Sequence, residues 1–412
     1  MHYKILALRK NTLGGGTFHR LFLPLSKMDA HFTDQLTEEL VSRYDSLWIH
    51  YKCDIHPTQL SLWRLKYGFQ IVLDIDDTWT IPINHPSYEA VSKSAHWSKQ
   101  FAIIADYVVC STPQVEEMVK PYNENTIVVP NRIPYGEGQY HVRQESLESF
   151  MSRKIRVGFC GSISHMEDWM SIHGKLRRVL SDGEFKQKCE FVLCGVPDVE
   201  RIKPPQFKER VELEVKKRGE HMRQRIEKVL SDSFKKHNQE VWNKIAGTTK
   251  PIIKYSRPPE DYIDLYREID ILLCPLVDND LNRKKSSLKL WEAACTDTYC
   301  IVSSLYKDKD LDIYPVENWY ENIKSLIKDK EKFFHLKNST SQYVRGLSDY
   351  HQECVLPRQD VLGKRRSIDL DIHGITYKED QLTEYKPYLN TVNSISQRSY
   401  LFENNVLLNL YQ

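Results

Sequence analysis

The residues best suited to chemistry lie in the segment 282–294, which reads Asn-Arg-Lys-Lys-Ser-Ser-Leu-Lys-Leu-Trp-Glu-Ala-Ala. Ser286 and Ser287 are typical of a helix start, because a serine oxygen can accept hydrogen bonds from the first amides of a helix. Such a start directs unpaired N–H groups and a positive dipole at a bound anion. Three lysines would add charge there, and a glutamate about two turns further could accept from sugar hydroxyls: Lys284, Lys285, Lys289 and Glu292. The segment predicts a nucleoside diphosphate site, although an amphipathic helix with a solvated lysine face would show the same pattern.

Apolar segments on both sides of this candidate site predict how it is positioned. Residues 269–276 and 299–304 both read as short buried strands. A helix that follows a parallel strand begins at the carboxyl end of that strand, where α/β proteins bind their ligands. We therefore expect the helix start to face a crevice at this edge of a parallel sheet.

A second group of acidic residues follows an apolar strand at residues 71–78, Ile-Val-Leu-Asp-Ile-Asp-Asp-Thr. This pattern resembles the nucleophile strand of haloacid-dehalogenase-type phosphatases, which would make Asp74 the nucleophile, Asp76 the acid/base and Mg²⁺ the cofactor. Those domains usually begin with this strand, whereas here it is the third strand predicted. They also need a later Gly-Asp metal motif, and residues 308–312 lack the glycine. The phosphatase stays an alternative interpretation.

Composition sets the broad class of the protein without naming a partner. The chain has 412 residues, enough for two or three domains, and a formal net charge of +2. Its nine cysteines include no Cys-x-x-Cys pair, and the closest pairs fall in or beside apolar segments, which favours buried free thiols. The sequence shows no signal-peptide pattern and no apolar segment of the ~18 residues that span a membrane. We therefore expect a protein of the cytoplasm, in a bacterium or a phage-infected host.

Apolar strands alternate with helical patterns over the first three quarters of the chain, which predicts α/β domains with parallel sheets. Before a polar, turn-rich segment near 135–153, the predicted strands are Lys4–Leu8, Ser46–His50, Gln70–Asp74, Tyr107–Cys110 and Thr126–Val129. After it they are Ile155–Cys160, Glu190–Cys194, Ile252–Tyr255, Ile271–Cys274 and Cys300–Ser303. This arrangement predicts two tandem Rossmann-like domains, at residues 1–140 and 153–345.

Two further segments stand outside this pattern. Residues 201–250 carry fourteen Lys/Arg against seven Asp/Glu, with apolar residues at helical spacing, and predict a basic helical insertion in the second domain. Its charge would suit a phosphate backbone, although a solvated helix face is the more common use of such a pattern. Residues 346–412 lose the periodicity, and we expect this tail to pack back on the body through the apolar residues near its end.

Four motifs in order resemble the GT-B glycosyltransferases. Gly14-Gly-Gly16 follows the first strand, as the glycine-rich loop of that fold does. Residues 108–113 and 128–133 resemble the last strands of the amino-terminal domain, and Gly158-Phe-Cys-Gly-Ser-Ile-Ser-His-Met-Glu-Asp168 resembles the loop after the first strand of the donor domain. The resemblance covers roughly residues 1–345. It implies a cleft between the two domains and transfer of a sugar from a nucleotide sugar, such as a UDP-sugar, to a hydroxyl.

The resemblance also implies the residues of the site. Glu292 would bind the donor ribose, while the amides of Gly161 and Ser162 would lie near the diphosphate. His165 and Asp168 are either a donor contact or a capping pair. The residues implied to bind the donor are Gly15, Gly16, Arg20, Gly161, Ser162, His165, Asp168, Lys285, Ser286, Lys289 and Glu292. The residues implied to act on the acceptor in catalysis are His19, Asp76 and Asp77.

The sequence departs from the family pattern at two points. Many retaining members have a Glu-x7-Glu pair, but Lys284 stands at the earlier position. The usual Gly-Arg and Lys-Gly phosphate clamp is also absent after Gly161, so Lys285, Lys289 or Arg177 would have to replace it. We expect a nucleotide sugar as co-substrate, no metal and no other cofactor, because fixed positive groups would replace Mg²⁺. Retention of anomeric configuration follows from the resemblance only.

The acceptor and the catalytic status are left open by the sequence. A saccharide is the common acceptor of such enzymes, but GT-B enzymes of phages glycosylate modified DNA bases, and the basic insertion would suit DNA. A GT-B-like protein that binds a nucleotide or nucleic acid without catalysis would explain the two missing motifs. The oligomeric state does not follow from the sequence.

Overall fold

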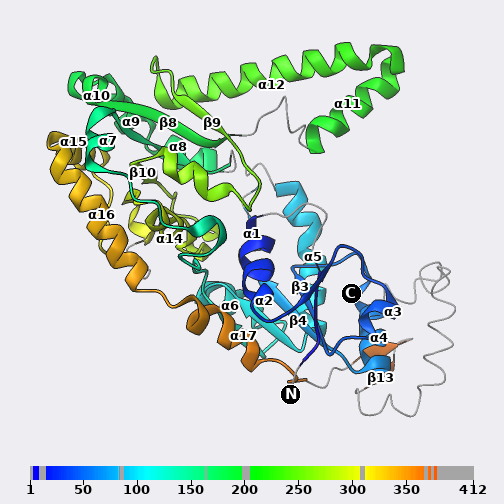
Figure 1. Ribbon diagram of the computed structural model, residues 1–412. Coiled ribbons are helices and arrows are strands. Elements are labelled where there is room, and N and C mark those ends of the chain that lie inside the picture. The colour runs from blue at the N-terminus through cyan, green and yellow to red at the C-terminus, as the bar shows by residue number, and fades with distance from the viewer. Residues whose placement is uncertain are drawn as a thin grey trace. The chain divides into compact units, whose positions relative to one another are not determined.

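The computed structural model describes residues 3–8, 15–81, 83, 88–162, 165–196, 205–306, 311–365, 370–372 and 375–377 (Figure 1). Within these ranges, the side chains of 89–90, 205–210, 233–242, 244, 370–372 and 375–377 are not described. The chain divides into two compact units. The first unit comprises Met1–Arg132, Arg283–Ser286 and Asp349–Gln412, and the second comprises Ile133–Asn282 and Ser287–Ser348.

The first unit is built on a six-stranded parallel sheet in the order β2-β1-β3-β4-β5-β6. Its strands are β1 (Ile5–Leu8), β2 (His31–Thr33), β3 (Ser46–His50), β4 (Gln70–Ile75), β5 (Tyr107–Cys110) and β6 (Thr126–Val128). The sequence predicted all of them except β2. That edge strand has three residues, none of them buried, so it lacks the apolar pattern by which the others were recognised.

The second unit is built on a five-stranded parallel sheet in the order β11-β10-β7-β8-β9. Its strands are β7 (Ile155–Cys160), β8 (Cys189–Val196), β9 (Ile252–Tyr255), β10 (Ile271–Cys274) and β11 (Tyr299–Val302). All five were predicted from the sequence. The prediction of an α/β protein with two Rossmann-like sheets is therefore confirmed.

Helices connect the strands in both units. In the first unit they are α1 (Gly15–Thr17), η1 (Phe18–Phe22), α2 (Leu23–Ser26), α3 (Glu38–Val41), α4 (Pro57–Tyr67), α5 (Tyr88–Ile104), α6 (Pro113–Val119), η7 (His351–Val355) and α17 (Leu356–Asp360). In the second they are η2 (Gly138–Tyr140), α7 (Leu147–Ser152), α8 (Met166–Ser171), α9 (His173–Ser181), α10 (Gly183–Lys188), α11 (Pro205–Arg218), η4 (Glu220–Met222), α12 (Arg223–Ala246), η5 (Tyr262–Glu268), α14 (Leu288–Cys295), η6 (Ser304–Tyr306), α15 (Trp319–Lys328) and α16 (Lys330–Gly346). Helix α13 (Asp280–Lys284) lies at a boundary between the units, and β12 (Leu370–Ile372) and β13 (Ile375–Tyr377) pair as an antiparallel hairpin.

Local sequence explains where several of these helices begin and end. Thr112 caps α6 by accepting a hydrogen bond from the Val115 amide at 3.2 Å, and Pro113 follows at the first helical position. Helix α4 also begins with a proline, and it ends at Gly68, whose φ of 75° is the left-handed conformation that glycine adopts without strain. These caps and turns set where each helix begins and ends. They thereby fix the ends of the neighbouring strands, where the candidate site residues lie.

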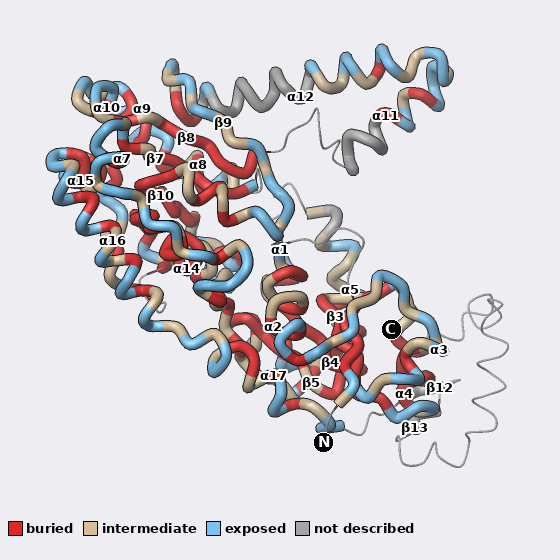
Figure 2. The backbone as a smooth tube through the Cα atoms, in the orientation of Figure 1, coloured by how far each residue is buried: buried red, intermediate tan, exposed pale blue. Residues whose placement is uncertain are grey.

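Both faces of the first sheet are covered by apolar side chains. The strands β3 and β4 of this sheet are drawn mostly as buried residues in Figure 2. Alternate residues of β4 enter different clusters, because successive side chains of a strand point to opposite faces. Ile71 and Leu73 pack with one cluster, while Val72 packs with the other, which includes Val355 and Val361 from the carboxyl-terminal part of the chain. Residues 349–365 are thus part of the core of the first unit.

A buried ion triad fastens this carboxyl-terminal segment to the first unit. Asp74 in β4 has an exposed side-chain fraction of 0%. One of its oxygens accepts a hydrogen bond from Arg20 Nε at 2.6 Å, and the other accepts one from Arg358 Nη2 at 2.9 Å. Arg20 also donates to the carbonyl of Val129 at 2.7 Å and to Asn131 Oδ1 at 2.9 Å. The triad therefore connects η1, the sheet and α17.

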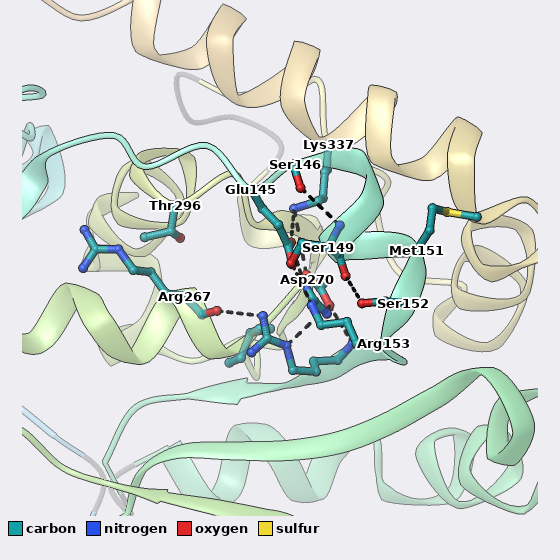
Figure 3. A network of polar contacts seen from close by, with 12 residues as sticks. Glu145, Ser146, Ser149, Met151, Ser152, Arg153, Arg267, Asp270, Thr296 and Lys337 are labelled. Atoms are coloured by element: carbon teal, nitrogen blue, oxygen red, sulfur yellow. Dashed lines mark hydrogen bonds and ion pairs between the residues drawn. The ribbon is translucent and has the colours of Figure 1, made fainter.

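A second polar network holds the start of the second unit (Figure 3). Asp270 is buried before β10 and accepts two hydrogen bonds from Arg153, at 2.7 and 2.8 Å. Arg153 also donates to Glu145, and buried Lys337 on α16 lies 3.9 Å from both carboxylates. Burial alone would raise the pKa of Asp270, but these cations hold it below its ordinary value. The network attaches the segment 145–153 to the sheet that follows it.

Helices α11 and α12 form a hairpin in the basic segment predicted as an insertion. Val211, Val215 and Ile226 are buried between them, and the end of α12 packs against α9. Between residues 211 and 232, six Lys/Arg stand against five Asp/Glu. Several of these charges form ion pairs inside the hairpin, including Lys217 with Glu214 and Arg223 with Glu212. The basic excess of the segment therefore lies outside this part of the hairpin.

The cysteines and the hydropathy of the helices agree with expectation. All nine cysteines are buried free thiols, as predicted. Among the described residues, no helix is both long enough and apolar enough to cross a membrane.

We predict that Asp74→Asn destabilises the protein by about 3–5 kcal/mol, because it leaves two buried arginines without a counter-charge. Urea unfolding at neutral pH measures the effect. Asp360→Asn, the same change at an exposed position of α17, is the matched control and is expected to stay within about 0.5 kcal/mol of wild type. Equal free energies of unfolding for the two variants would contradict the proposed role of the triad.

Candidate functional site

In the second unit, candidate side chains converge at the glycine that follows β7. Gly161 has a φ of 152°, in the region that favours glycine. A Cβ at this position would lie 3.0 Å from His165 Cδ2 and 3.4 Å from Lys289 Nζ. An imidazole edge and an ammonium group therefore lie against the same backbone position, although they come from a loop and from α14. The structure brings together three of the residues that the sequence singled out.

Asp168 fixes the orientation of His165. One oxygen of the Asp168 carboxylate lies 3.0 Å from His165 Nδ1. The other accepts hydrogen bonds from the Val277 amide at 2.9 Å and from Asn282 Nδ2 at 2.7 Å. Because His165 makes no side-chain cap hydrogen bond, the interpretation of the pair as a helix cap is wrong. With Nδ1 held by Asp168, the opposite edge of the ring faces Gly161.

The family resemblance implies that the amide of Gly161 lies near the diphosphate, but in the structure this amide has another partner. Its N–H donates to the carbonyl of Cys194 at 3.0 Å, so this hydrogen is already used inside the sheet. Gly195, with a φ of 85°, lets the end of β8 approach this turn closely, since a Cβ there would lie 2.8 Å from the Gly161 carbonyl oxygen. The Gly161 N–H is therefore not available to a bound anion, because one N–H donates one strong hydrogen bond.

The expected serine cap of the lysine-rich helix is also wrong. Helix α14 begins after Ser287, which makes no side-chain cap hydrogen bond. The hydroxyl of Ser286 accepts a hydrogen bond from Asn131 Nδ2 at 2.8 Å, within the first unit. Lys285 belongs to the same short segment of the first unit. The structure thus groups Lys285 and Ser286 separately from Lys289 and Glu292, whereas the sequence treated them as one site.

Glu292 lies in the second turn of α14 and is buried. It accepts a hydrogen bond from the Tyr266 hydroxyl at 2.5 Å. Burial and the charge of Glu292 raise the pKa of Tyr266 well above its ordinary value, so that Tyr266 stays a hydrogen-bond donor. The sulfur of Cys160 lies 3.7 Å from the hydroxyl of the neighbouring Tyr262, and burial raises the pKa of Cys160 to about 12. Glu292 is therefore a buried carboxylate that the Tyr266 hydroxyl orients.

In the first unit, a hydrogen-bonded chain joins three side chains from separate elements. His50 ends β3, and its Nε2 lies 3.0 Å from Asp76 Oδ1, just beyond the end of β4. Its other nitrogen, Nδ1, lies 2.9 Å from the hydroxyl of Thr17 in α1. The side chain of His50 has an exposed fraction of 10% and that of Asp76 of 20%. The structure pairs Asp76 with His50, which the sequence analysis did not name.

Tyr51 supports this chain from one side. It is a non-glycine residue with a φ of 59°, a conformation that costs free energy and is often found at functional sites. Its ring centroid lies 4.6 Å from that of His50, and its hydroxyl accepts a hydrogen bond from the Asp77 amide at 2.7 Å. A hydrogen bond from the same hydroxyl contributes to the low pKa of Asp76. Tyr51 therefore bridges Asp76 and Asp77.

Asp76 is ionised over the whole physiological range. Burial alone would raise its pKa, but the charge and hydrogen bond of His50, the charge of Arg20 and the hydrogen bond of Tyr51 lower it to about 2. A carboxylate with such a low pKa is a weak base. It orients and stabilises a cation beside it more readily than it takes up a proton.

Gly16 makes room for the Asp76–His50 pair. A Cβ at Gly16 would lie 2.6 Å from Asp76 Oδ2 and 3.0 Å from His50 Cε1, whereas a Cβ at Gly15 would meet nothing within 4 Å. Both glycines are helical residues of α1. The group that approaches Gly16 closely is therefore the carboxylate of Asp76. Binding of the donor phosphate by Gly15 and Gly16 stays a prediction that this geometry does not favour.

The remaining predicted residues of the first unit have other neighbours. The buried guanidinium of Arg20 is engaged by Asp74, so its geometry runs against a role in donor binding. His19 is partly buried on η1, where its ring packs edge-on against Phe18. Asp77 accepts a hydrogen bond from the Thr78 amide at 2.8 Å. Ser162 follows Gly161, and the Ser162 carbonyl accepts a hydrogen bond from the His165 amide at 3.1 Å.

The phosphatase alternative is not supported. Both oxygens of Asp74, its nucleophile, are paired with arginines in the core, and a carboxylate held in this way is not positioned to attack phosphorus. Among the described residues, no three His, Cys, Asp or Glu side chains are grouped to hold a metal ion. Metal independence of the reaction stays a prediction.

Four residues of these sites were given no role by the sequence analysis: His50, Tyr51, Tyr266 and Asn282, although Asn282 begins the segment 282–294. His50 and Tyr51 did have a signal, because polar residues at the carboxyl end of a buried parallel strand lie where α/β proteins bind ligands. Tyr266 and Asn282 had none, since each is identified only by a contact with a residue far away in the sequence.

Comparison with known proteins bears on the fold. No protein-family model matches the sequence, and no curated protein matches it. The structure of a UDP-forming α,α-trehalose-phosphate synthase from Burkholderia vietnamiensis aligns over 88% of this chain and 98% of its own, at 9% sequence identity and a TM-score of 0.53. Another, from Burkholderia xenovorans, aligns over 79% and 75%, at 13% identity and a TM-score of 0.50. The likeness shows the fold: two Rossmann-like units of the GT-B type, which the sequence motifs resemble.

We predict that Gly16→Ala lowers the free energy of unfolding by about 1–3 kcal/mol, because the new methyl group displaces a carboxylate held by two partners. Gly15→Ala is the matched control, one residue earlier in the same helical turn. It is expected to be neutral or to add up to about 1 kcal/mol, since alanine restricts the unfolded chain. Thermal unfolding of both variants measures the difference. Equal destabilisation by both would show that Asp76 does not lie against Gly16.

A second prediction concerns acid pH. Because the pKa of Asp76 is about 2 in the folded chain and near 3.8 ordinarily, its contribution to stability is present above pH 4 and is lost as the pH falls towards 2. The stability difference between wild type and Asp76→Asn should therefore shrink by about 2 kcal/mol between pH 5 and pH 2. Urea unfolding at intervals of half a pH unit measures it. A difference that is constant over this range would contradict the lowered pKa.

Proposed function

We propose that this chain is a glycosyltransferase that moves a sugar from a UDP-sugar to an acceptor hydroxyl. One observation carries the proposal: the Lys289 ammonium and the edge of the His165 ring meet at Gly161, at the carboxyl end of β7. Parallel α/β sheets bind nucleotides at this edge. The fold supports the choice of donor, since the two similar structures are described as UDP-forming synthases.

The second unit would bind the donor and stabilise the leaving diphosphate. Lys289 supplies a fixed charge, and His165, held by Asp168, supplies an N–H in a set orientation. Helix α14 adds the dipole of its amino terminus. Preorganised charges of this kind favour the transition state because they need not reorient as negative charge develops on the leaving group. In this proposal they replace the missing clamp of the family, and no metal is required.

Glu292 would bind the ribose hydroxyls of the nucleotide. The hydrogen bond from Tyr266 holds one carboxylate oxygen, which leaves the orientation of the group fixed before the nucleotide binds. A preoriented carboxylate binds a diol with less loss of side-chain entropy. This role follows the family resemblance residue by residue, and retention of configuration rests on the same resemblance.

A saccharide hydroxyl is the acceptor that we propose. The described part of the basic hairpin is nearly balanced in charge, and several of its basic side chains are paired with glutamates of the same hairpin. A surface that binds DNA instead presents unpaired Lys and Arg to the phosphates. The described side chains of the hairpin therefore give modified DNA no specific support as an acceptor.

We predict that wild type binds UDP more tightly than 1 mM and that two variants weaken binding through different parts of the ligand. Lys289→Met should weaken UDP binding about 10- to 100-fold, because a charge-assisted hydrogen bond is lost, but should leave uridine binding unchanged. Glu292→Gln should weaken binding of both UDP and uridine. Isothermal titration with UDP, and competition with uridine, measure the two affinities.

Controls at exposed positions of the second unit are Lys175→Met and Glu331→Gln, which should bind like wild type. Absence of UDP and UDP-sugar binding by wild type would refute the proposed function. Binding of UDP without release of UDP from any UDP-sugar, in the presence of saccharide acceptors, would instead identify a binding protein on a transferase fold.

A further inference from the structure

The first unit contains a chain of hydrogen bonds that the proposed function does not yet use. It runs from the hydroxyl of Thr17 to His50 Nδ1 at 2.9 Å, and from His50 Nε2 to Asp76 Oδ1 at 3.0 Å. The three residues come from α1, from the end of β3 and from the loop after β4. Thr17 and His50 are both more than nine-tenths buried.

The charge of Asp76 indicates which atom is the donor in each of these hydrogen bonds. Asp76 is ionised above acid pH and can only accept, so Nε2 of His50 carries the hydrogen of that bond. In a neutral imidazole the other nitrogen, Nδ1, is then an acceptor, and the Thr17 hydroxyl must donate to it. The lone pairs of the Thr17 oxygen are left to accept from a further hydroxyl. A serine hydrolase triad uses the same logic, in which a carboxylate fixes the tautomer of a histidine that receives a hydroxyl proton.

Three features hold the chain in this geometry. The strained backbone of Tyr51 places its ring 4.6 Å from that of His50 and its hydroxyl beside both Asp76 and Asp77. Gly16 lets Asp76 Oδ2 approach the helix that carries Thr17. Strain in a residue that contacts two hydrogen-bonded partners persists only where the surrounding structure enforces it.

The charged groups around His50 are few and each has a defined partner. Asp76 faces it directly, and Tyr51 packs on it as a neutral phenol, because burial and the charges of Asp76 and Asp77 raise the pKa of Tyr51 well above its ordinary value. Asp74 is the register neighbour of His50 on β4, but both of its oxygens are engaged by arginines. One of these, Arg20, also acts on Asp76 through its charge.

We propose that Thr17, His50 and Asp76 form a proton relay that activates the acceptor hydroxyl, an inference that rests on the proposed transferase function. The acceptor oxygen forms its bond to the anomeric carbon on the face from which the diphosphate leaves, so that the configuration is retained, while the bond from that carbon to the diphosphate oxygen breaks. The acceptor proton passes to the Thr17 oxygen, and the Thr17 proton passes to His50 Nδ1. Asp76 stabilises the imidazolium and stays ionised. The diphosphate leaves with the electron pair of the broken bond.

In this relay Thr17 contacts the acceptor, His50 holds the proton, and Asp76 and Tyr51 are positioning residues. The assignment differs from the expectation that Asp76, Asp77 or His19 acts as the base. A hydroxyl between substrate and histidine also explains why both ring nitrogens of His50 have partners in the chain before any substrate binds.

The test compares wild type with Thr17→Val, Thr17→Ser and His50→Gln. Thr126→Val is the matched control, because it also removes a part-buried hydroxyl hydrogen bond, to Glu116, from the first unit. Release of UDP from UDP-glucose, UDP-galactose and UDP-N-acetylglucosamine, with water or a saccharide as acceptor, gives the turnover rate. UDP titration checks that each variant is folded and binds, and ¹⁵N spectra of the histidine side chains report the tautomer of His50.

We expect Thr17→Val and His50→Gln to lower turnover about 10²- to 10⁴-fold with UDP affinity unchanged, while Thr17→Ser stays within several-fold of wild type. His50 should be the Nε2–H tautomer, with an Nδ1 signal that shifts in Thr17→Val.

The Nδ1–H tautomer in wild type, or wild-type turnover in Thr17→Val, would overturn the relay and leave the transferase function standing. Wild type that neither binds UDP nor releases it from any of the three donors would refute the proposed function itself. The two failures are therefore distinguishable.

Discussion

The pairing of Asp74 with two arginines is the interaction on which the first unit depends. A carboxylate in the middle of a sheet is stable only if its charge is compensated, and the triad does so with Arg20 from η1 and Arg358 from α17. Two positive charges against one negative charge leave a positive excess in the core. That excess acts two residues further along the chain, where Arg20 helps to lower the pKa of Asp76. The carboxyl-terminal segment thus contributes to the core and, through this triad, to the electrostatics of the site.

Close backbone approach sets the geometry of the second unit. Gly195 and Gly161 bring the ends of β8 and β7 together, and the N–H of Gly161 is used in joining them. This leaves the side chains of His165 and Lys289 as the groups that meet at the same point.

Most of the fold could be predicted from the sequence, because the strands are apolar and turn residues separate them clearly. Ten of the eleven strands of the two parallel sheets were recognisable, and the one missed, β2, is short and not buried. The sites were predicted less well, because their chemistry depends on which strand ends become neighbours. Asp76 could be named from its motif, but its partner His50 is 26 residues away and is set by the register of β3 with β4. The predicted helix cap at Ser286 was wrong for a related reason. Its hydroxyl accepts a hydrogen bond from Asn131, and local capping preferences cannot predict a contact between residues so far apart in the sequence.

The proposed function divides its two tasks, activation of the acceptor and stabilisation of the leaving diphosphate, between the two units. The first unit presents the ionised Asp76 beside His50 and Tyr51, a setting that stabilises a proton taken from a hydroxyl. The second presents Lys289 and His165, a setting that stabilises negative charge on a leaving diphosphate. An ammonium group placed near Asp76 would compete with His50 for the carboxylate. Asp76 would then stabilise an imidazolium at His50 less strongly. Keeping the base and the cationic groups on separate sheets allows each to be tuned by its own neighbours.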